Sequence, residues 1–271
     1  MPDNRALRVM SFNVRCPGGQ DGEHAWERRY GPVIRVIQGY GTDVAGLQEP
    51  VRGQIEDLHA GLARYAWFGA GRLDGREAGE FTPIFYRQDR IQVLEQDTFW
   101  LSERPETPGS VGWDAGCVRI VTWGRLHDRL TDRAFFHFNT HFDHHGALAR
   151  LQSAQLLLEA VARLAGPAPV VVTGDFNCTE SGEPYRLLTG AGSARGGLLR
   201  LEDARHAARL GHHGPEFTFN AFGYPQALRT KIDHIFVANG VTVLRHGILS
   251  DAWRVGTPSD HLPVVAEIVF A

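Results

Sequence analysis

Segments typical of β-strands outnumber segments typical of helices along this chain, and several neighbouring strands have no helix between them. Apolar residues recur at helical spacing only in residues 30–40, 51–62 and 146–164. A doubly wound parallel sheet would alternate strands and helices more strictly. The pattern therefore predicts an α+β fold of two mixed, mainly antiparallel sheets packed face to face, with helices outside. The strand-like segments, rich in β-branched and aromatic residues, are residues 7–14, 43–48, 81–86, 91–101, 118–127, 133–142, 169–173, 232–237, 241–249 and 263–270.

The glycine- and proline-rich stretches between these segments are short, and no repeat divides the 271 residues. They are residues 16–22, 69–79, 105–116, 190–197 and 211–215. Short stretches of this kind are typical of loops within a domain, whereas domain boundaries fall in flexible linkers that few contacts cross. We therefore expect residues 1–271 to form a single domain.

The charge balance excludes one class of protein. Lys and Arg number 28 and Asp and Glu 31, which gives a formal net charge of −3. Proteins that coat nucleic acid carry a strongly basic surface, which this composition does not supply, although a nuclease that binds a few phosphates locally stays possible.

The ends and the cysteines bear on where the protein works. Asp3, Asn4 and Arg5 stand where a secretory signal would be apolar, and no run reaches the roughly 18–20 apolar residues of a membrane span. The three cysteines are far apart and form neither a disulfide framework nor a zinc motif. We expect a cytoplasmic monomer with no membrane span and no obligate protein partner.

Carboxylate, carboxamide and imidazole side chains recur where the apolar segments end, which is where layered folds form ligand sites. Carboxylates are hard oxygen donors, which Mg²⁺ or Mn²⁺ combines with water and with phosphate oxygens of a substrate. Asp175 and Asn177 are two residues apart, so both face one side of an extended segment. One of them could activate a water while the other donates a hydrogen bond to a phosphate. The strand-end residues are Asn13, Glu49, His141, Asp175, Asn177, Asp233, Asp260 and His261.

These residues fall within six short motifs that occur in order along the chain: SFNVR, LQEP, NTHFD, GDFN, IDH and SDHLP. Each motif alone is weak, but the ordered set resembles the endonuclease/exonuclease/phosphatase superfamily with the DNase I-like fold. Residues 99–102, 112–115 and 119–123 are similar to a poorly characterised bacterial branch of it. The resemblance implies a four-layer α/β/β/α sandwich and divalent-metal-dependent hydrolysis of phosphoesters.

The resemblance also implies which residues hold the metal and activate water. Glu49 would be the principal ligand of Mg²⁺ or Mn²⁺, with Asn13 and Asp260 close to the metal or its waters. Asp175 would activate the attacking water, and Asn177 would contact the phosphate. A second metal near Asp175 and Asn177 is left open.

A further group is expected around the phosphate. The resemblance implies that Asp233 and His261 form a carboxylate–histidine pair with His261 on the phosphate. It also implies that His141 contacts the phosphate or assists the leaving group. Arg119 is a candidate for binding phosphate, because a guanidinium can bind it bidentately. His144 lies three residues after His141 and could face the same pocket.

Three functions from different classes fit these residues. The first is a phosphodiester hydrolase that uses an activated water for in-line attack on phosphorus, acting on nucleic acid or on a smaller phosphodiester. The second is a phosphomonoesterase whose pocket closes around a terminal phosphate. The third is a catalytically silent binding module, which has no need for the intact set of Glu49, Asp175, Asn177, Asp260 and His261.

Another hypothesis concerns the histidines, because imidazole suits zinc. They lack the HExxH spacing and a cysteine pair that would strengthen a zinc assignment. Trp113 and Trp253 are candidates to line a substrate pocket. The histidines in question are His137, His141, His144, His145, His212 and His213.

Overall fold

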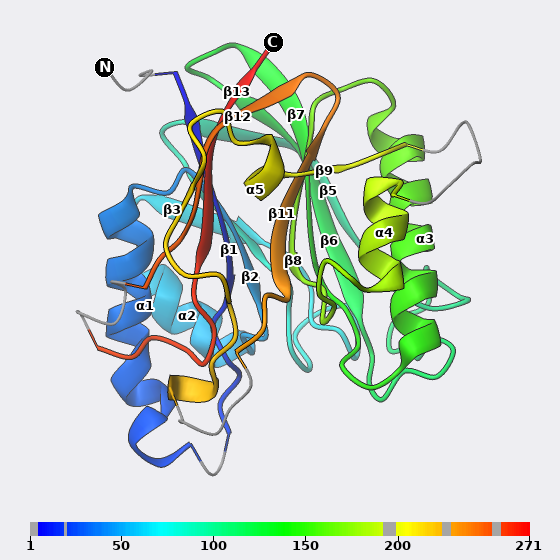
Figure 1. The fold of residues 1–271 in the computed structure, drawn as a ribbon. Coiled ribbons are helices and arrows are strands. Elements are labelled where there is room, and N and C mark those ends of the chain that lie inside the picture. Colours follow the sequence, from blue (N-terminus) through cyan, green and yellow to red (C-terminus); the bar gives the residue numbers. More distant parts are fainter. Residues whose placement is uncertain (1–4, 19–20, 192–198, 224–228, 251–255) are drawn as a thin grey trace.

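Two β-sheets lie face to face at the centre of the molecule, and helices cover their outer faces (Figure 1). The computed structural model describes residues 5–18, 21–191, 199–223, 229–250 and 256–271. The order of layers is helices, sheet, sheet, helices. This confirms the predicted α+β sandwich of the α/β/β/α type.

Among the described strands, most neighbours are antiparallel, and the pairs β1–β2, β7–β8 and β10–β12 are parallel, so both sheets are mixed. The first sheet has seven strands in the order β10 (His212–His213), β12 (Val241–Ile248), β13 (Val264–Phe270), β1 (Leu7–Asn13), β2 (Val44–Gln48), β4 (Ile84–Arg87) and β3 (Tyr65–Phe68). The second has six strands in the order β5 (Ile91–Trp100), β6 (Ile120–Asp128), β7 (Arg133–His141), β8 (Val170–Asp175), β11 (Asp233–Ala238) and β9 (Glu202–Asp203).

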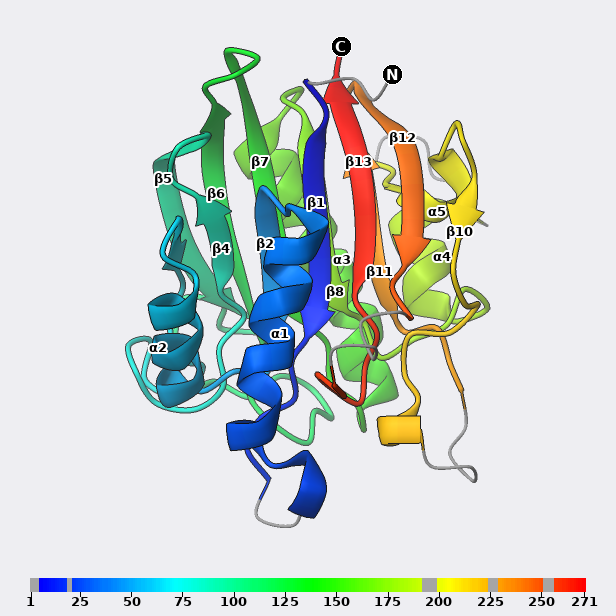
Figure 2. The same ribbon diagram turned by 90° about the vertical axis from the view of Figure 1, so that its left-hand side faces the viewer.

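The helices bury their apolar faces on the outside of the sandwich. Figure 2 shows α1 (Trp26–Tyr40) and α2 (Arg52–Gly61) in front of the first sheet. On the far side, α3 (Ala147–Ala165) and α4 (Glu183–Thr189) cover the second sheet. One buried apolar cluster fills each helix–sheet interface, and a third fills the space between the sheets. The remaining short elements are α5 (Ala204–Ala207) and the 3-10 turns at Gly22–His24 and Ala221–Gly223.

Some boundaries differ from the sequence-based prediction. The segment predicted over residues 81–86 becomes β4 only from Ile84, because Pro83 has no N–H to donate to a neighbouring strand. The elements β3 and α4 were not predicted, and β10 lies inside a predicted loop. In the described ranges, no helix combines the length and the apolar character that crossing a bilayer requires.

Strand register assembles the polar strand ends. In the first sheet, β1 and β2 run parallel with Asn13 opposite Gln48, so both strands finish at the same edge. In the second sheet, His141 lies opposite Asp175, and Asp175 lies opposite Asp233. Residues from three distant parts of the sequence therefore stand in one row at one end of the sandwich.

The two sheets approach closely at Gly46 in β2. A Cβ atom there would overlap Thr173 Oγ1 and lie 2.5 Å from Asn139 Oδ1. Both side chains are already fixed, because Thr173 Oγ1 donates to Asn139 Oδ1 (3.0 Å) and Asn139 Nδ2 donates to the Leu47 carbonyl (2.7 Å). Only glycine therefore lets the buried polar layer between the sheets close.

We expect Gly46→Ala to lower the free energy of unfolding by roughly 1–3 kcal/mol, the usual cost of overfilling a packed interior. Urea denaturation followed by circular dichroism measures the change. Gly53→Ala is the matched control, because Gly53 lies in α2 with nothing within 4 Å of the added methyl, and alanine there should stabilise the helix by about 0.5–1 kcal/mol. Unchanged stability of Gly46→Ala would show that the sheets can separate at no cost.

Candidate active site

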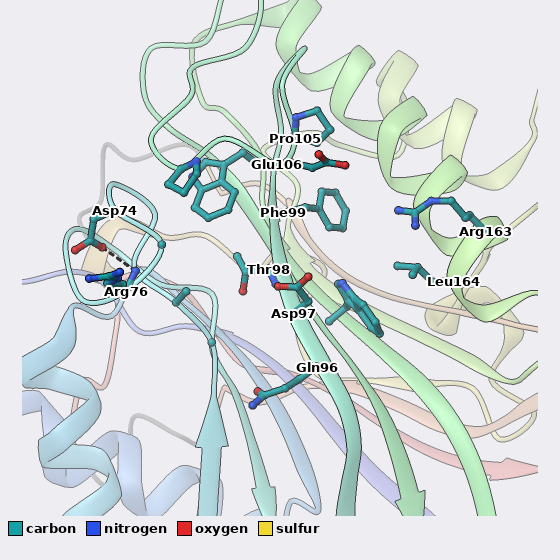
Figure 3. A pocket seen from close by; sticks show the side chains of 16 residues that line it. Asp74, Arg76, Gln96, Asp97, Thr98, Phe99, Pro105, Glu106, Arg163 and Leu164 are labelled. Carbon is teal, nitrogen blue, oxygen red and sulfur yellow. Dashed lines mark hydrogen bonds between the residues drawn. The ribbon is translucent and has the colours of Figure 1, made fainter.

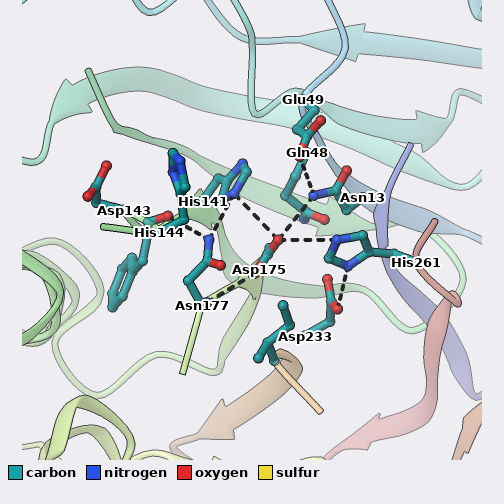
Figure 4. Close-up of polar contacts among 12 residues, drawn as sticks. Asn13, Gln48, Glu49, His141, Asp143, His144, Asp175, Asn177, Asp233 and His261 are labelled. Carbon is teal, nitrogen blue, oxygen red and sulfur yellow. Dashed lines mark hydrogen bonds and ion pairs between the residues drawn. The ribbon is translucent and has the colours of Figure 1, made fainter. Parts of the chain in front are cut away.

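The carboxamide of Asn13 connects the two sheets at the polar end of the sandwich. Asn13 Nδ2 donates to Glu49 Oε1 (2.8 Å) and to Asp175 Oδ2 (3.0 Å), as Figure 4 shows. Asn13 ends β1 in the first sheet, whereas Asp175 ends β8 in the second. The candidate metal ligand and the candidate base are therefore held at a fixed separation.

Glu49 is oriented by its backbone. It follows β2 with φ at 75°, a left-handed conformation that turns its side chain into the site. The Cys16 amide donates to Glu49 Oε2 at 2.8 Å. Burial raises the pKa of Glu49, but the hydrogen bonds from Cys16 and Asn13, together with the positive charges of His261 and Arg15, lower it below its usual range. The carboxylate is therefore ionised and able to ligate a cation.

Asp175, Asp233 and His261 form a buried group in which one side-chain nitrogen or oxygen of each residue lies within 4.8 Å of the others. His261 Nδ1 lies 2.8 Å from Asp233 Oδ2, and His261 Nε2 lies 3.8 Å from Asp175 Oδ2 (Figure 4). Burial lowers the pKa of His261, but the negative charge and hydrogen bond of Asp233 raise it well above the ordinary value. Asp233 thus keeps a protonated imidazole beside Asp175.

The carboxyl group of Asp175 has a raised pKa, whereas the pKa of Glu49 is lowered. Burial and the neighbouring charge of Asp233 raise the pKa of Asp175 to about 7. Its Oδ1 accepts a hydrogen bond from the Asn177 amide at 3.0 Å, and its Oδ2 lies 3.4 Å from His141 Nε2. A carboxyl group with a pKa near neutrality is suited to accept a proton from water.

His141 and Asn177 form the wall beside Asp175. Asn177 Nδ2 lies 3.1 Å from His141 Nε2 and donates to the Phe142 carbonyl at 3.0 Å. Burial, followed by the positive charge of Arg119, lowers the pKa of His141 well below its ordinary value. His141 is therefore neutral, unlike His261.

Asp260 is a buried carboxylate in the loop before β13. Ser259 Oγ lies within hydrogen-bond distance of both the Asn13 carbonyl (2.7 Å) and Asp260 Oδ1 (3.2 Å), which fixes the loop before β13 against β1. Burial raises the pKa of Asp260, and the negative charge of Glu49 raises it further. Glu49 is half-buried and Asp260 is buried, and carboxylates are the hard oxygen donors that a divalent cation prefers. The donor set therefore fits the implied Mg²⁺ or Mn²⁺.

Arg119 and His144, the two remaining candidates, contact each other. Arg119 is buried, with Nη2 at 3.0 Å from His144 Nδ1 and Nε at 3.6 Å from Asp143 Oδ1. Asp143 in turn accepts hydrogen bonds from the amides of Gly116, His145 and Gly146, so it fixes the loop that follows β7. Figure 4 places His144 next to His141.

The structure does not support the histidine–zinc hypothesis. His137 lies in the middle of β7 and contacts Thr173 Oγ1 at 2.9 Å, whereas His212 in β10 pairs with His246 at the far edge of the first sheet. In the described part of the chain, each group with metal-ligand spacing contains one histidine at most. The six histidines therefore form no common cluster, because His212 and His213 lie in β10 of the first sheet whereas His137 and His141 lie in β7 of the second.

Two charged residues at the site, Arg72 and Glu80, were not predicted. Arg72 lies in the glycine-rich stretch of residues 69–79, and Glu80 directly follows it. Charged residues in such a stretch usually face solvent, and no sequence pattern marks these two. Arg15 and Asp143 were also not singled out, although the SFNVR and NTHFD motifs contain them.

A pocket of about 770 Å³ lies beside the free edge of β5 (Figure 3). Asp74, Arg76, Asp97 and Glu106 line it, together with Arg163 from the end of α3. The predicted site residues and Trp113 are not among its lining residues. Trp253, the other predicted pocket residue, lies outside the described residues.

The comparison with protein families agrees with this geometry. Residues 10–261 match the model of the Endonuclease/Exonuclease/phosphatase family. The chain belongs to this family. Members of the Endonuclease/Exonuclease/phosphatase family are hydrolases of phosphoesters and generally use divalent metals.

Solved members of the family share the whole fold. A protein of Bacteroides vulgatus is 38% identical with a TM-score of 0.92, and the match covers 98% of this chain and 99% of that one. The mannosyl-6-phosphatase of Bacteroides thetaiotaomicron is 35% identical with a TM-score of 0.88, and the match covers 97% of this chain and 100% of that one. Nocturnin of Drosophila melanogaster is 27% identical over 208 residues, but the chain spans only 30% of its length.

Proposed function

We propose that the protein is a hydrolase of phosphomonoesters that depends on Mg²⁺ or Mn²⁺. The observation that supports the hydrolytic part is the Asn13 carboxamide, which joins the half-buried Glu49, the candidate metal ligand, to Asp175, the candidate proton acceptor. The mannosyl-6-phosphatase that matches the chain over nearly its full length supports a phosphomonoester, and in particular a sugar phosphate, as the substrate class. The phosphodiester, the substrate class that the sequence favoured, becomes the alternative outcome of the test.

Glu49 and Asp260 would hold the cation, with Asn13 beside it. The ion would supply positive charge that stabilises the negative charge developing on the phosphoryl oxygens. Arg15 Nε lies 4.0 Å from Asp260 Oδ2 and adds fixed positive charge at the same place.

Asp175 and the residues around it would accept a proton from water and position the phosphate. Asp175 would accept a proton from the attacking water, since its pKa near 7 makes it a base at neutral pH. Protonated His261, held by Asp233, would donate a hydrogen bond to a phosphoryl oxygen. Asn177 fixes Asp175 through its amide and presents its carboxamide beside His141.

Neutral His141 and the Arg119–His144 pair would contact the other side of the phosphate. The guanidinium of Arg119 is buried, and a buried cation binds a phosphate dianion more strongly than an exposed one does. Its contact with His144 limits the directions in which it can point.

The test is a panel of substrates assayed after removal of metal with EDTA. Mannose 6-phosphate and phenyl phosphate represent monoesters, bis-p-nitrophenyl phosphate represents diesters, and single-stranded DNA and RNA represent nucleic acids. We expect Mg²⁺ or Mn²⁺ to restore hydrolysis of the monoesters, with a higher kcat/KM than for any diester. Faster cleavage of diesters would return the protein to the phosphodiesterase class, and metal-dependent turnover of none of these substrates would refute the proposal.

A further inference from the structure

Glu80 places a carboxylate at the rim of the site that the proposed mechanism does not use. The Phe81 amide donates to the Pro50 carbonyl at 2.9 Å, which fixes Glu80 beside the turn that carries Glu49. Glu80 Oε2 accepts a hydrogen bond from Arg72 Nη1 at 2.6 Å and lies 3.9 Å from Arg119 Nη1. Among the described residues, none donates a hydrogen bond to Glu80 Oε1. One oxygen of the carboxylate is thus held and the other is open.

The two arginines around Glu80 also have unused donors. Arg72 Nε and Arg119 Nε are buried and have no hydrogen-bond partner. Both residues line a cavity of about 10 Å³ together with Glu80 and His141, so the cavity adjoins the proposed phosphate site. A cavity of that size holds roughly one water molecule. Arg72, with an unpaired Nε donor, and Glu80, with an open Oε1 acceptor, both line this cavity, whereas Arg119 Nε lies 3.6 Å from Asp143 Oδ1. A donor and an acceptor side by side match a hydroxyl group, which both donates and accepts.

Glu80 is poorly suited to bind a second metal ion. Arg72 and Arg119 already place two positive charges on the same carboxylate oxygen. A divalent cation bound there would lie close to both guanidinium groups and be repelled by them. A neutral hydroxyl group meets no such repulsion.

We propose that Glu80, held by Arg72, binds a hydroxyl group of the substrate's leaving alcohol and so selects sugar-like phosphates over aryl or alkyl phosphates. The inference rests on the proposed phosphomonoesterase function and adds the residue that recognises the alcohol. A hydroxyl donating to a carboxylate forms a charge-assisted hydrogen bond. A leaving alcohol that carries no further hydroxyl group would leave the Glu80 carboxylate desolvated and unpaired, which a site of this kind disfavours strongly.

The experiment compares two substrates and two variants. We expect Glu80→Gln to lower kcat/KM for mannose 6-phosphate by about 10–100-fold, the loss that accompanies one hydrogen bond to a charged group. The kcat/KM for phenyl phosphate, whose leaving group has no further hydroxyl, should stay unchanged. Glu77→Gln is the matched control, because Glu77 lies in the same loop with a side chain 69% exposed. Glu77→Gln should change kcat/KM for neither substrate. Glu80→Asp, which keeps the charge but shortens the side chain, should lose activity in the same direction and serves if Glu80→Gln does not fold.

Other results would overturn the inference. Equal losses on both substrates, or a weaker affinity for Mn²⁺ in Glu80→Gln by calorimetry, would place Glu80 on the phosphate or the metal. A measurement of ligand binding distinguishes failure of this inference from failure of the proposed phosphomonoesterase function. If the wild type hydrolyses no monoester, calorimetry with mannose 6-phosphate and inorganic phosphate still applies. A preference for the sugar phosphate that Glu80→Gln abolishes would support the inference, and equal affinities in the wild type would refute it.

Discussion

Asp175→Asn is expected to lower kcat for phosphoester hydrolysis by about 10²–10⁴, the contribution typical of a positioned general base. The amide cannot accept a proton from water, but it keeps the size of the side chain and an oxygen for the Asn177 amide. Asp132→Asn is the matched control, because that carboxylate is 95% exposed. A variant with more than half of the wild-type kcat would remove Asp175 from the proposed mechanism.

The same substitution should change how stability depends on pH. The folded-state pKa of Asp175 is about 7, whereas its ordinary value is 3.8. Between these values the folded state binds a proton that the unfolded state has released, so the wild type loses stability as pH rises through this range. Asparagine does not titrate. The stability gain of Asp175→Asn should therefore grow from pH 4 to pH 7 and level off above it, at about 1.4 kcal/mol per pH unit at most.

Urea denaturation in EDTA at several pH values measures this gain. Metal must be absent because a bound cation would stabilise the ionised carboxylates. A difference in stability that does not vary with pH would show that Asp175 titrates normally in the folded protein.

Glu49→Gln is expected to weaken the binding of Mn²⁺ by at least about 10²-fold, with a loss of kcat/KM at subsaturating metal of similar size. Changing residues that merely orient metal ligands already costs 10–100-fold in metal affinity, and removing the charge of a ligand should cost more. Isothermal calorimetry with Mn²⁺ gives the affinity without reference to activity. Glu56→Gln makes the same chemical change on a side chain 61% exposed in α2 and should leave both values unchanged. Wild-type affinity in Glu49→Gln would overturn its assignment as the principal ligand.

The sequence predicted which polar residues lie together at one end of the sandwich better than it predicted where the strands begin and end. Asn13 and Asp175 each end an apolar strand, Glu49 directly follows one and Asp233 begins one. They could be identified because strand ends are where layered folds form ligand sites. Their assembly depends on register, which pairs Asp175 with both His141 and Asp233. A single sequence does not reveal which strands are neighbours, but the order of the motifs matched a family in which these residues meet.

The unpredicted parts have a common physical cause. Tyr65–Phe68 in β3 is too short to show a clear alternation of apolar and polar residues. Arg72 and Glu80 lie in a loop whose sequence looks solvent-exposed, and only the fold of that loop brings them next to Arg119. Long-range contacts of this kind leave no local pattern in the sequence.

The hydrogen bonds of Asn13 have a thermodynamic consequence. The proposed metal donors Glu49 and Asp260 flank strands of the first sheet, whereas Asp175 and Asp233 belong to the second, and Asn13 joins the two sets. A phosphate seated between them would contact both layers at once, so it would bind only while the layers are docked. Any such ligand would stabilise the entire sandwich against unfolding, by an amount that rises with ligand concentration. Substrate occupancy would therefore be linked to the integrity of the fold at Asn13.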